Sequence, residues 1–443
     1  MSKLIAFMYL AAFILLSKGS FAQTYSLANS IRIALEKNQQ LKNYKLDVAS
    51  AAYGIQEAKS ALLPTVDLTG QFMYYKDLPS QYAPASAFGG AEGQYTKLTM
   101  SIRQTTSANF QVSQTLYNQT ALTGVKAAKV VQESSSLQEK VVREDLVYNV
   151  TATYYTIQVL DENLIRLADN IANLEKTISI NSVLKDNELV SENIHNRMLI
   201  NLENLRNQYE NQKLLQEKNV TLLKNLMDLD ISEPLAVEPF GYNEVLYESD
   251  SYDISQRPDL QLQQTQIKFA KLDKKVIAAG YYPVLSNKFS FGYTGYYNDF
   301  APLKQINNDW IKSSYFALTL KVPVFDGFMK RNQLHQKEIQ IQKNVNTLER
   351  MKANANKEME DARDNYTANK TLLVNNKKSL DLAEKLFTSS QREYESGITS
   401  VTELLNAQND LSSARTNYSS ALLNLKLAEL SLKKAAGTLL TNL

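Results

Sequence analysis

The stretch that decides the fold lies near the end of the chain, where residues 401–436 read VTELLNAQNDLSSARTNYSSALLNLKLAELSLKKAA. From Leu404 onward a large side chain recurs every seven residues, and an alanine follows three positions later. The large set is Leu404, Leu411, Tyr418, Leu425, Leu432 and Leu439, and the small set is Ala407, Ala414, Ala421, Ala428 and Ala435. A sustained heptad repeat predicts helices that supercoil around their neighbours. We therefore expect an extended coiled coil here rather than a compact bundle.

The positions of proline and glycine predict that other helices are long as well. Proline is absent from residues 85–233 and 324–443, and glycine is absent from 125–240. Both residues disfavour helix interiors, so their absence permits long uninterrupted helices. The expected helices are 119–187 and 328–396, each followed by a shorter one, 191–229 and 400–436.

Four segments alternate with a period of two, which is typical of β-strands. They are 66–74, 110–117, 289–297 and 316–325, with loops over 76–106 and 298–314. Each has an apolar face and a small or polar face, as transmembrane strands do, although a soluble sheet with one wet face remains the alternative. Four strands cannot close a barrel, and lipid cannot satisfy open edges, so copies of the chain are expected to associate.

The same order of helices and strands occurs twice, which indicates an internal duplication. The predicted parts are a signal peptide (1–22), a first repeat of helix, two strands, long helix and short helix (23–229), an equatorial linker (230–256) and a second repeat (257–443). The signal is assigned from Lys3, a short apolar run and Ser20-Phe21-Ala22 before the expected cut. An N-terminal membrane anchor is the alternative, but the run is shorter than a spanning helix needs.

Composition argues against catalysis and against nucleic-acid binding. Lys and Arg total 48 against 46 for Asp and Glu, so the chain has no strongly basic character. It has no cysteine, which excludes disulfides and thiolate metal sites, and its two histidines argue against a histidine-based site. We expect no catalytic residue, no metal site and no cofactor.

Several short phrases, in their order and spacing, resemble those of the TolC family of outer-membrane efflux and secretion channels. They are Ala34-Leu35-Glu36-Lys37-Asn38, Arg257-Pro258-Asp259-Leu260, Val322-Pro323-Val324-Phe325-Asp326-Gly327, Tyr394-Glu395-Ser396-Gly397-Ile398-Thr399-Ser400, Leu404-Leu405-Asn406-Ala407-Gln408 and Ala436-Gly437-Thr438-Leu439. The resemblance covers nearly all of the chain after residue 22.

The resemblance implies a mostly helical homotrimer in the bacterial outer membrane. Three chains would share a twelve-stranded β-barrel, four strands from each, that continues into a twelve-helix coiled-coil tube in the periplasm. The tube would dock a periplasmic adaptor linked to an inner-membrane transporter of RND or ABC type. It would serve as a passive duct, in contact with outer-membrane lipid, for small molecules or for proteins in type I secretion. A stand-alone porin and a structural trimeric coiled coil are the alternatives.

The resemblance also suggests where the functional residues lie. The adaptor-docking turns would be Glu188, Leu189, Val190 and Ser191 in the first repeat and Gly397, Ile398, Thr399 and Ser400 in the second. The periplasmic aperture would involve Glu403, Asn406, Tyr394 and Thr399. Three copies of Glu403 would form a cation-binding ring, the alternative being an ordinary solvated charge. Thr399 stands where the family has an arginine, so the family's ion-pair lock is not expected.

Overall fold

The computed structural model describes residues 23–186, 191–239, 253–300 and 310–441. The predicted signal peptide and Glu188, Leu189 and Val190 of the first turn lie outside these ranges. The chain forms two compact units: unit 1 is Met1–Val48, Ser134–Gln264 and Asn346–Leu443, and unit 2 is Ala49–Glu133 and Thr265–Val345. Among the described residues, no helix combines the length and apolarity needed to cross a membrane.

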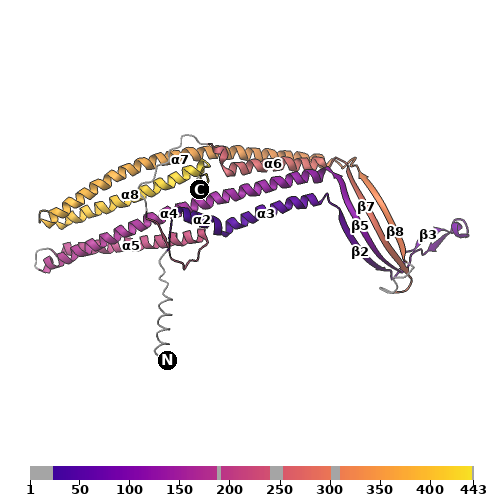
Figure 1. Ribbon diagram of the computed structural model, residues 1–443, viewed down its shortest axis with the longest axis horizontal. Coiled ribbons are helices and arrows are strands. Elements are labelled where there is room, and N and C mark those ends of the chain that lie inside the picture. Colours follow the sequence, from indigo (N-terminus) through magenta and orange to yellow (C-terminus); the bar gives the residue numbers. More distant parts are fainter. Residues whose placement is uncertain (1–22, 187–190, 240–252, 301–309, 442–443) are drawn as a thin grey trace, which may run out of the picture. The chain divides into compact units, whose positions relative to one another are not determined.

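Long helices dominate the chain, as their lack of proline and glycine predicts. The helices are α2 (Leu27–Lys37), α3 (Gln39–Ser60), α4 (Gln119–Asp186), α5 (Glu192–Met227), α6 (Pro258–Ala279), α7 (Met329–Glu395) and α8 (Val401–Ala435). The 68 residues of α4 and the 67 of α7 confirm the two predicted long helices, and α5 and α8, with 36 and 35 residues, confirm the shorter ones. Within unit 1, α5 returns along α4 and α8 returns along α7 (Figure 1).

The heptad positions form the contact between α7 and α8. Leu425 and Leu432 of α8 are buried against Met359 and Tyr366 of α7, and Leu411 is buried further along the same helix pair. The seven-residue repeat therefore marks the residues that face the neighbouring helix, and it keeps one stripe of each helix against the other over many turns.

A second buried core includes Tyr25, close to the first described residue, together with Tyr154 and Val237. Strand β1 (Gln23–Tyr25) pairs in parallel with β6 (Leu235–Val237), which lies in the predicted linker, and a short helix η2 (Ile254–Gln256) ends that linker. The Tyr154 hydroxyl donates to the Tyr25 carbonyl at 2.9 Å and accepts from the Glu238 amide at 3.1 Å. Since Tyr154 is buried, these two bonds satisfy a hydroxyl that water cannot reach.

Unit 2 contains a four-stranded antiparallel sheet with the order β2–β5–β7–β8. The strands are β2 (Thr65–Tyr74), β5 (Gln104–Asn118), β7 (Val284–Tyr297) and β8 (Ile311–Lys321). In register, Val66, Val112, Phe289 and Phe316 form one row across all four strands, and Leu68, Phe110 and Phe291 form the next row across three of them. The alternation predicted for single strands therefore combines into one continuous apolar face.

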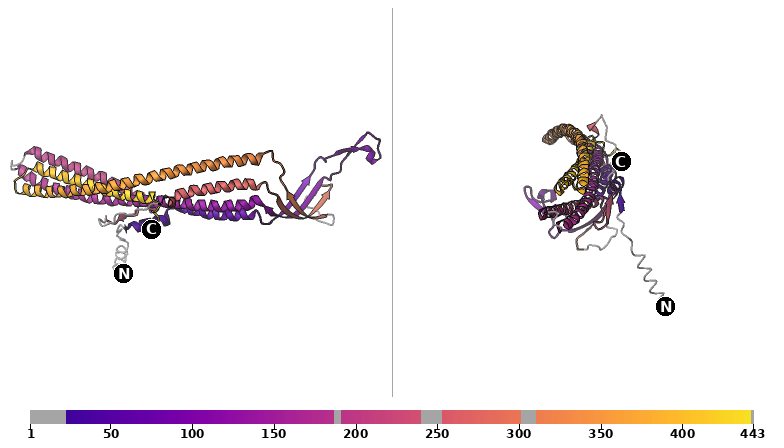
Figure 2. Two further views of the ribbon diagram at one scale, coloured as in Figure 1. Left: turned by 90° about the horizontal axis from the view of Figure 1, so that it is seen from above. Right: turned by 90° about the vertical axis from the view of Figure 1, so that its left-hand side faces the viewer.

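The structure corrects the predicted end of one strand and the predicted extent of both loops. Strand β8 ends at Lys321 and not at Phe325, since Pro323 has no amide hydrogen to continue the ladder. The predicted loop 76–106 contains a hairpin, β3 (Gln81–Pro84) and β4 (Tyr95–Leu98), joined through a short helix η1 (Ala85–Phe88) and extending beyond the end of the sheet (Figure 2). The same loop also loses its last residues to β5, and the predicted loop 298–314 ends at Ile311, where β8 begins.

Candidate gate and belt sites

The turn between α7 and α8 is a tight reversal at Gly397. Gly397 has φ +70°, its amide donates to the Tyr394 carbonyl at 2.9 Å, and the Ile398 amide donates to the Glu393 carbonyl at 2.8 Å. These two bonds form a Schellman motif, which satisfies the last carbonyls of a helix and needs a left-handed residue. The turn exposes Ile398, whose side chain is 76% accessible.

Tyr394, the predicted aperture tyrosine, joins α7 to α4. Its hydroxyl accepts a 3.0 Å hydrogen bond from the side-chain amide of Asn181, which is fully buried. The Tyr394 ring packs against a core cluster formed by Leu174, Met198, Leu202, Leu205, Val401 and Leu405 of α4, α5 and α8. This tie within one chain could not be found from sequence spacing, because its partners are 213 residues apart.

The remaining aperture residues lie at the beginning of α8. Ser400 caps the helix by accepting from the Glu403 amide at 3.3 Å, and the Glu403 and Asn406 side chains are exposed. Thr399 is half-buried in the turn. Asn406 opens onto a cleft of 190 Å³ that is also lined by Arg197 of α5, whereas Glu403 does not line it. The two aperture residues therefore have different surroundings, and Arg197 is a charged neighbour that the sequence did not suggest.

A larger polar cleft of 530 Å³ adjoins the first, between α4, α5 and α8. Carboxamides dominate its lining, together with Arg166 and Arg415. Asn201 Nδ2, Gln212 Oε1 and Arg415 Nε are buried there with no hydrogen-bond partner in the described part of the chain. Because unpaired buried polar atoms are costly, this cleft suits water or a polar solute better than an apolar one.

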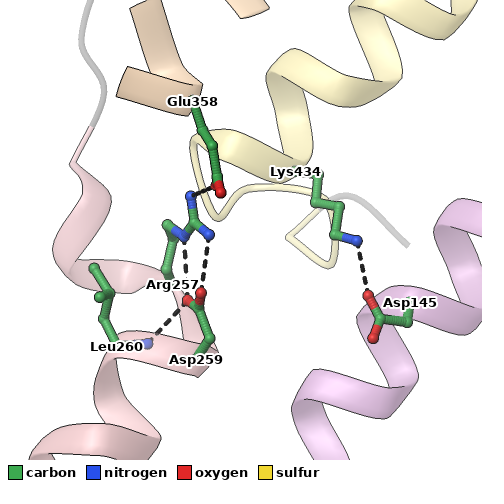
Figure 3. A network of polar contacts seen from close by, with 6 residues as sticks. All are labelled: Asp145, Arg257, Asp259, Leu260, Glu358 and Lys434. Atoms are coloured by element: carbon green, nitrogen blue, oxygen red, sulfur yellow. Dashed lines mark hydrogen bonds and ion pairs between the residues drawn. The ribbon is translucent and has the colours of Figure 1, made fainter. Parts of the chain in front are cut away.

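Arg257, from the phrase Arg-Pro-Asp-Leu, is the centre of a polar network in unit 1 (Figure 3). Its Nε and Nη2 donate to both carboxylate oxygens of Asp259, at 3.1 and 2.9 Å, and its Nη1 donates to Glu358 of α7 at 2.8 Å. Asp259 also accepts from the Leu260 amide at the first turn of α6. Gly437 completes the arrangement, because a side chain there would come within 3.0 Å of the Arg257 backbone.

Glu144 of α4 is a buried carboxyl close to this network. Burial raises its pKa to about 7; Lys434 and Arg257 oppose the rise, and Asp259 and Asp145 add to it. Lys434 itself pairs with Asp145 at 2.7 Å (Figure 3). One oxygen of Glu144 is buried with no hydrogen-bond partner in the described ranges. Sequence reasoning missed this residue, since nothing in its local pattern distinguishes it from a solvated heptad charge.

These clusters are arranged for holding helices together, and none resembles a catalytic centre. Within the described ranges, no group of three His, Asp or Glu side chains is placed to hold a metal ion. The fold that contains them is a set of long paired helices and an antiparallel sheet with one apolar face.

A family model defines the class of the protein. The model described as outer membrane efflux protein matches residues 30–182 and 253–438, so the chain belongs to the outer membrane efflux protein family. No curated protein sequence matches the chain.

Solved structures of outer-membrane channels share the fold. The Campylobacter jejuni CmeC channel is 17% identical with a TM-score of 0.74, over 93% of this chain and 86% of that one. Vibrio cholerae VceC is 14% identical with a TM-score of 0.73, over 93% and 96%. The open state of Neisseria gonorrhoeae MtrE is 18% identical with a TM-score of 0.74, over 93% and 89%.

Family membership settles the predicted type and location of the protein. The chain is an outer-membrane efflux channel protein with a TolC-like fold and a periplasmic extension, and it is a transport duct rather than an enzyme. Proteins of this family take part in efflux across the outer membrane.

Proposed function

We propose that three copies of this chain form a passive exit duct, each contributing four strands to a twelve-stranded barrel. The supporting observation is the sheet itself, which has one apolar face and two open edges. In the described part of the chain, β2 pairs only with β5 and β8 only with β7. Open backbone edges are not tolerated in lipid, so β8 of one copy would pair with β2 of the next until the ring closes.

Disulfide trapping tests this closure directly, because the chain contains no cysteine. Thr69→Cys on β2 is combined in turn with Ser313→Cys, Tyr315→Cys, Ala317→Cys or Thr319→Cys on β8, all on the polar face. We expect at least one combination to give covalent dimers and trimers, with nothing larger. Thr69→Cys with Ser290→Cys on the inner strand β7 is the control and should stay monomeric. Absence of cross-links, or a ladder continuing beyond three, would reject the trimeric barrel.

The partners proposed for the duct are a periplasmic adaptor and, through it, an inner-membrane transporter of RND or ABC type. The docking surface would be the two tip turns, Glu188–Ser191 and Gly397–Ser400, of which the second exposes Ile398. A photo-crosslinking amino acid at position 398 should trap an adaptor in living cells, whereas the same group at Tyr53, in the middle of α3, should not. Ion conductance with no trapped adaptor would favour the stand-alone porin instead.

We also propose that the chain is an internal duplication, with one tip turn in each repeat. The first repeat would be 23–229, the equatorial linker 230–256 and the second repeat 257–443. Matching lengths support it: α3 and α6 both have 22 residues, and α4 and α7 differ by one, as do α5 and α8. Asp228 and Gly437 end α5 and α8 in the same left-handed conformation. Glu403, Asn406, Tyr394 and Thr399 would border the aperture at the end of the tube.

A further inference from the structure

The connection between β8 and α7 has an unusual backbone. We call residues 322–328 the junction loop; it follows Lys321, the last residue of β8, and precedes Met329, the first of α7. Gly327 and Phe328 both have φ +65°. Glycine adopts this left-handed conformation freely, but a phenylalanine there is strained. Strained positions of this kind cluster at active sites, ligand clamps and switch regions.

The junction loop presents apolar side chains to its surroundings. Val324 is 92% exposed, Phe325 74% and Phe328 56%. The Phe325 and Phe328 rings meet edge to face at 5.4 Å, so they form one surface rather than two scattered residues. A contiguous exposed patch of this kind marks a contact with a membrane or another molecule.

A cavity of 550 Å³ beside this patch carries one uncompensated positive charge. Its lining includes two acids, each held by a lysine: Lys330 bonds Asp326 at 2.9 Å and Lys274 bonds Glu338 at 2.6 Å. The remaining strong cation is Arg331, for which the described residues provide no carboxylate partner within ion-pair distance. Its guanidinium lies 5.9 Å from the centre of the Phe328 ring. A guanidinium supported by an aromatic ring and lacking a carboxylate suits a phosphate.

The junction loop follows directly on a strand whose apolar side chains are exposed. Phe316, Leu318 and Leu320 alternate along β8 on the face that also carries Phe289 and Phe291, and their side chains are at least 60% exposed. In an outer-membrane protein this face meets hydrocarbon, and aromatic side chains flanked by Lys and Arg are typical of the adjoining interface.

We propose that the junction loop and Arg331 form a binding site for a glycerophospholipid at the periplasmic side of the outer membrane. Arg331 takes the phosphate, while Val324 and Phe325 lie against the upper part of an acyl chain. The site anchors the point where the strand leaves the membrane and the helix begins. The inference rests on the proposed placement of the sheet in the bilayer. Fluorescence quenching distinguishes a failure of the lipid site from a failure of that placement.

Tryptophan fluorescence locates the loop, since Trp310 is the only tryptophan in the chain. In a Trp310→Phe background, single tryptophans replace Phe325, Phe316 on β8 or Tyr53 on α3. The full chain is placed in vesicles of brominated phosphatidylcholine. We expect quenching at 325 and 316 and none at 53. Quenching at 316 but not at 325 overturns the lipid site and leaves the barrel intact; it is the result expected if a neighbouring copy covers Phe325. No quenching at either position overturns the membrane placement itself.

Affinity for lipid tests the role of Arg331. Detergent-purified protein is titrated with phosphatidylglycerol and bound lipid is counted by native mass spectrometry. Arg331→Gln should weaken binding about tenfold through loss of the charged hydrogen bonds. Arg350→Gln, an exposed arginine further along α7, is the control with the same change of charge. Wild-type affinity in Arg331→Gln overturns the site. Displacement of the lipid by millimolar inorganic phosphate would also overturn it, because the pocket would then be a site for free phosphate.

Discussion

The side-chain amide of Asn181 on α4 donates a 3.0 Å hydrogen bond to the hydroxyl of Tyr394 on α7, where each of these long helices nears its end. Asn181 is fully buried, and its Oδ1 has no hydrogen-bond partner in the described part of the chain. The pair therefore joins the two halves of the chain through an amide that is only partly satisfied, next to the proposed aperture.

Replacing Tyr394 with Phe should destabilise this end of the helices by about 1–3 kcal/mol, because Asn181 Nδ2 would then be buried without a partner. Hydrogen exchange along α4 and α7 would show the loss as faster exchange near residues 181 and 394. Tyr53→Phe, at an exposed position, is the control. Adding Asn181→Leu removes the orphaned amide and should restore part of the loss. An unchanged exchange rate in Tyr394→Phe would show that the bond contributes nothing.

Gly397→Ala should cost roughly 1 kcal/mol, since alanine is disfavoured at a φ of +70°. Gly124→Ala is the matched control: Gly124 lies within α4, and a Cβ added there would meet no atom within 4 Å. Alanine at position 124 should therefore gain about 0.5–1 kcal/mol. Thermal unfolding of the two variants should shift in opposite directions. A higher unfolding temperature for Gly397→Ala would refute the left-handed turn.

Glu144 should make stability depend on pH. Its pKa is raised from 4.5 to about 7 in the folded state, so between these values the folded chain binds more protons than the unfolded chain and stability falls as pH rises. The shift sets an upper limit of roughly 3 kcal/mol on the loss. Glu144→Gln should remove this fall of the unfolding free energy with pH, and it should be more stable than the wild type at pH 8. Glu57→Gln, at an exposed position, should retain the wild-type pH dependence. Parallel wild-type and Glu144→Gln unfolding curves against pH would contradict the raised pKa.

Arg257→Lys keeps the charge but loses the two-pronged contact with Asp259, and it should lower stability by about 2 kcal/mol. The guanidinium side chain is 13% exposed, so water replaces the lost bonds poorly. Arg32→Lys is the control, because Arg32 pairs with Glu36 in a geometry that leaves both side chains 60% exposed. Chemical denaturation followed by circular dichroism gives the comparison, and equal effects of the two variants would mean that the network in Figure 3 is not a structural tie.

Glu403→Gln tests the proposed ring at the aperture. Removing three carboxylates should reduce cation selectivity in planar bilayers and weaken block by a trivalent cation at least tenfold, roughly 1.4 kcal/mol. Glu192→Gln changes the same charge in the first turn of α5 and should leave both properties unchanged. If Glu403→Gln had the same selectivity and block as the wild type, there would be no cation-binding ring. Glu403 would then be an ordinary solvated charge that stabilises the N-terminus of a helix.

Much of the fold could be predicted from the sequence, because it is encoded at short range. Heptads from Leu404 to Leu439, the absence of proline and glycine and the period-two segments act over three to seven residues, so helix and strand identity follow from them. Gly397 was predictable for the same reason: one glycine interrupts a helical pattern. The end of β8 was missed because Val322 and Val324 continue the alternation of the strand in the sequence, while the missing amide of Pro323 stops the ladder.

The tertiary structure decided the contacts between distant parts of the chain. Arg257 meets Glu358 across 101 residues, Lys434 meets Asp145 across 289, and burial rather than any local motif raises the pKa of Glu144. The same holds for Arg331. The two acids of its cavity, Asp326 and Glu338, are paired with Lys330 and Lys274, and only the folded structure shows this. Periodicity in the sequence fixes which face of a helix or strand is apolar. A residue's contact partners, its burial and the net charge around it depend on the neighbours that pack against it, and these neighbours come together only in the folded chain.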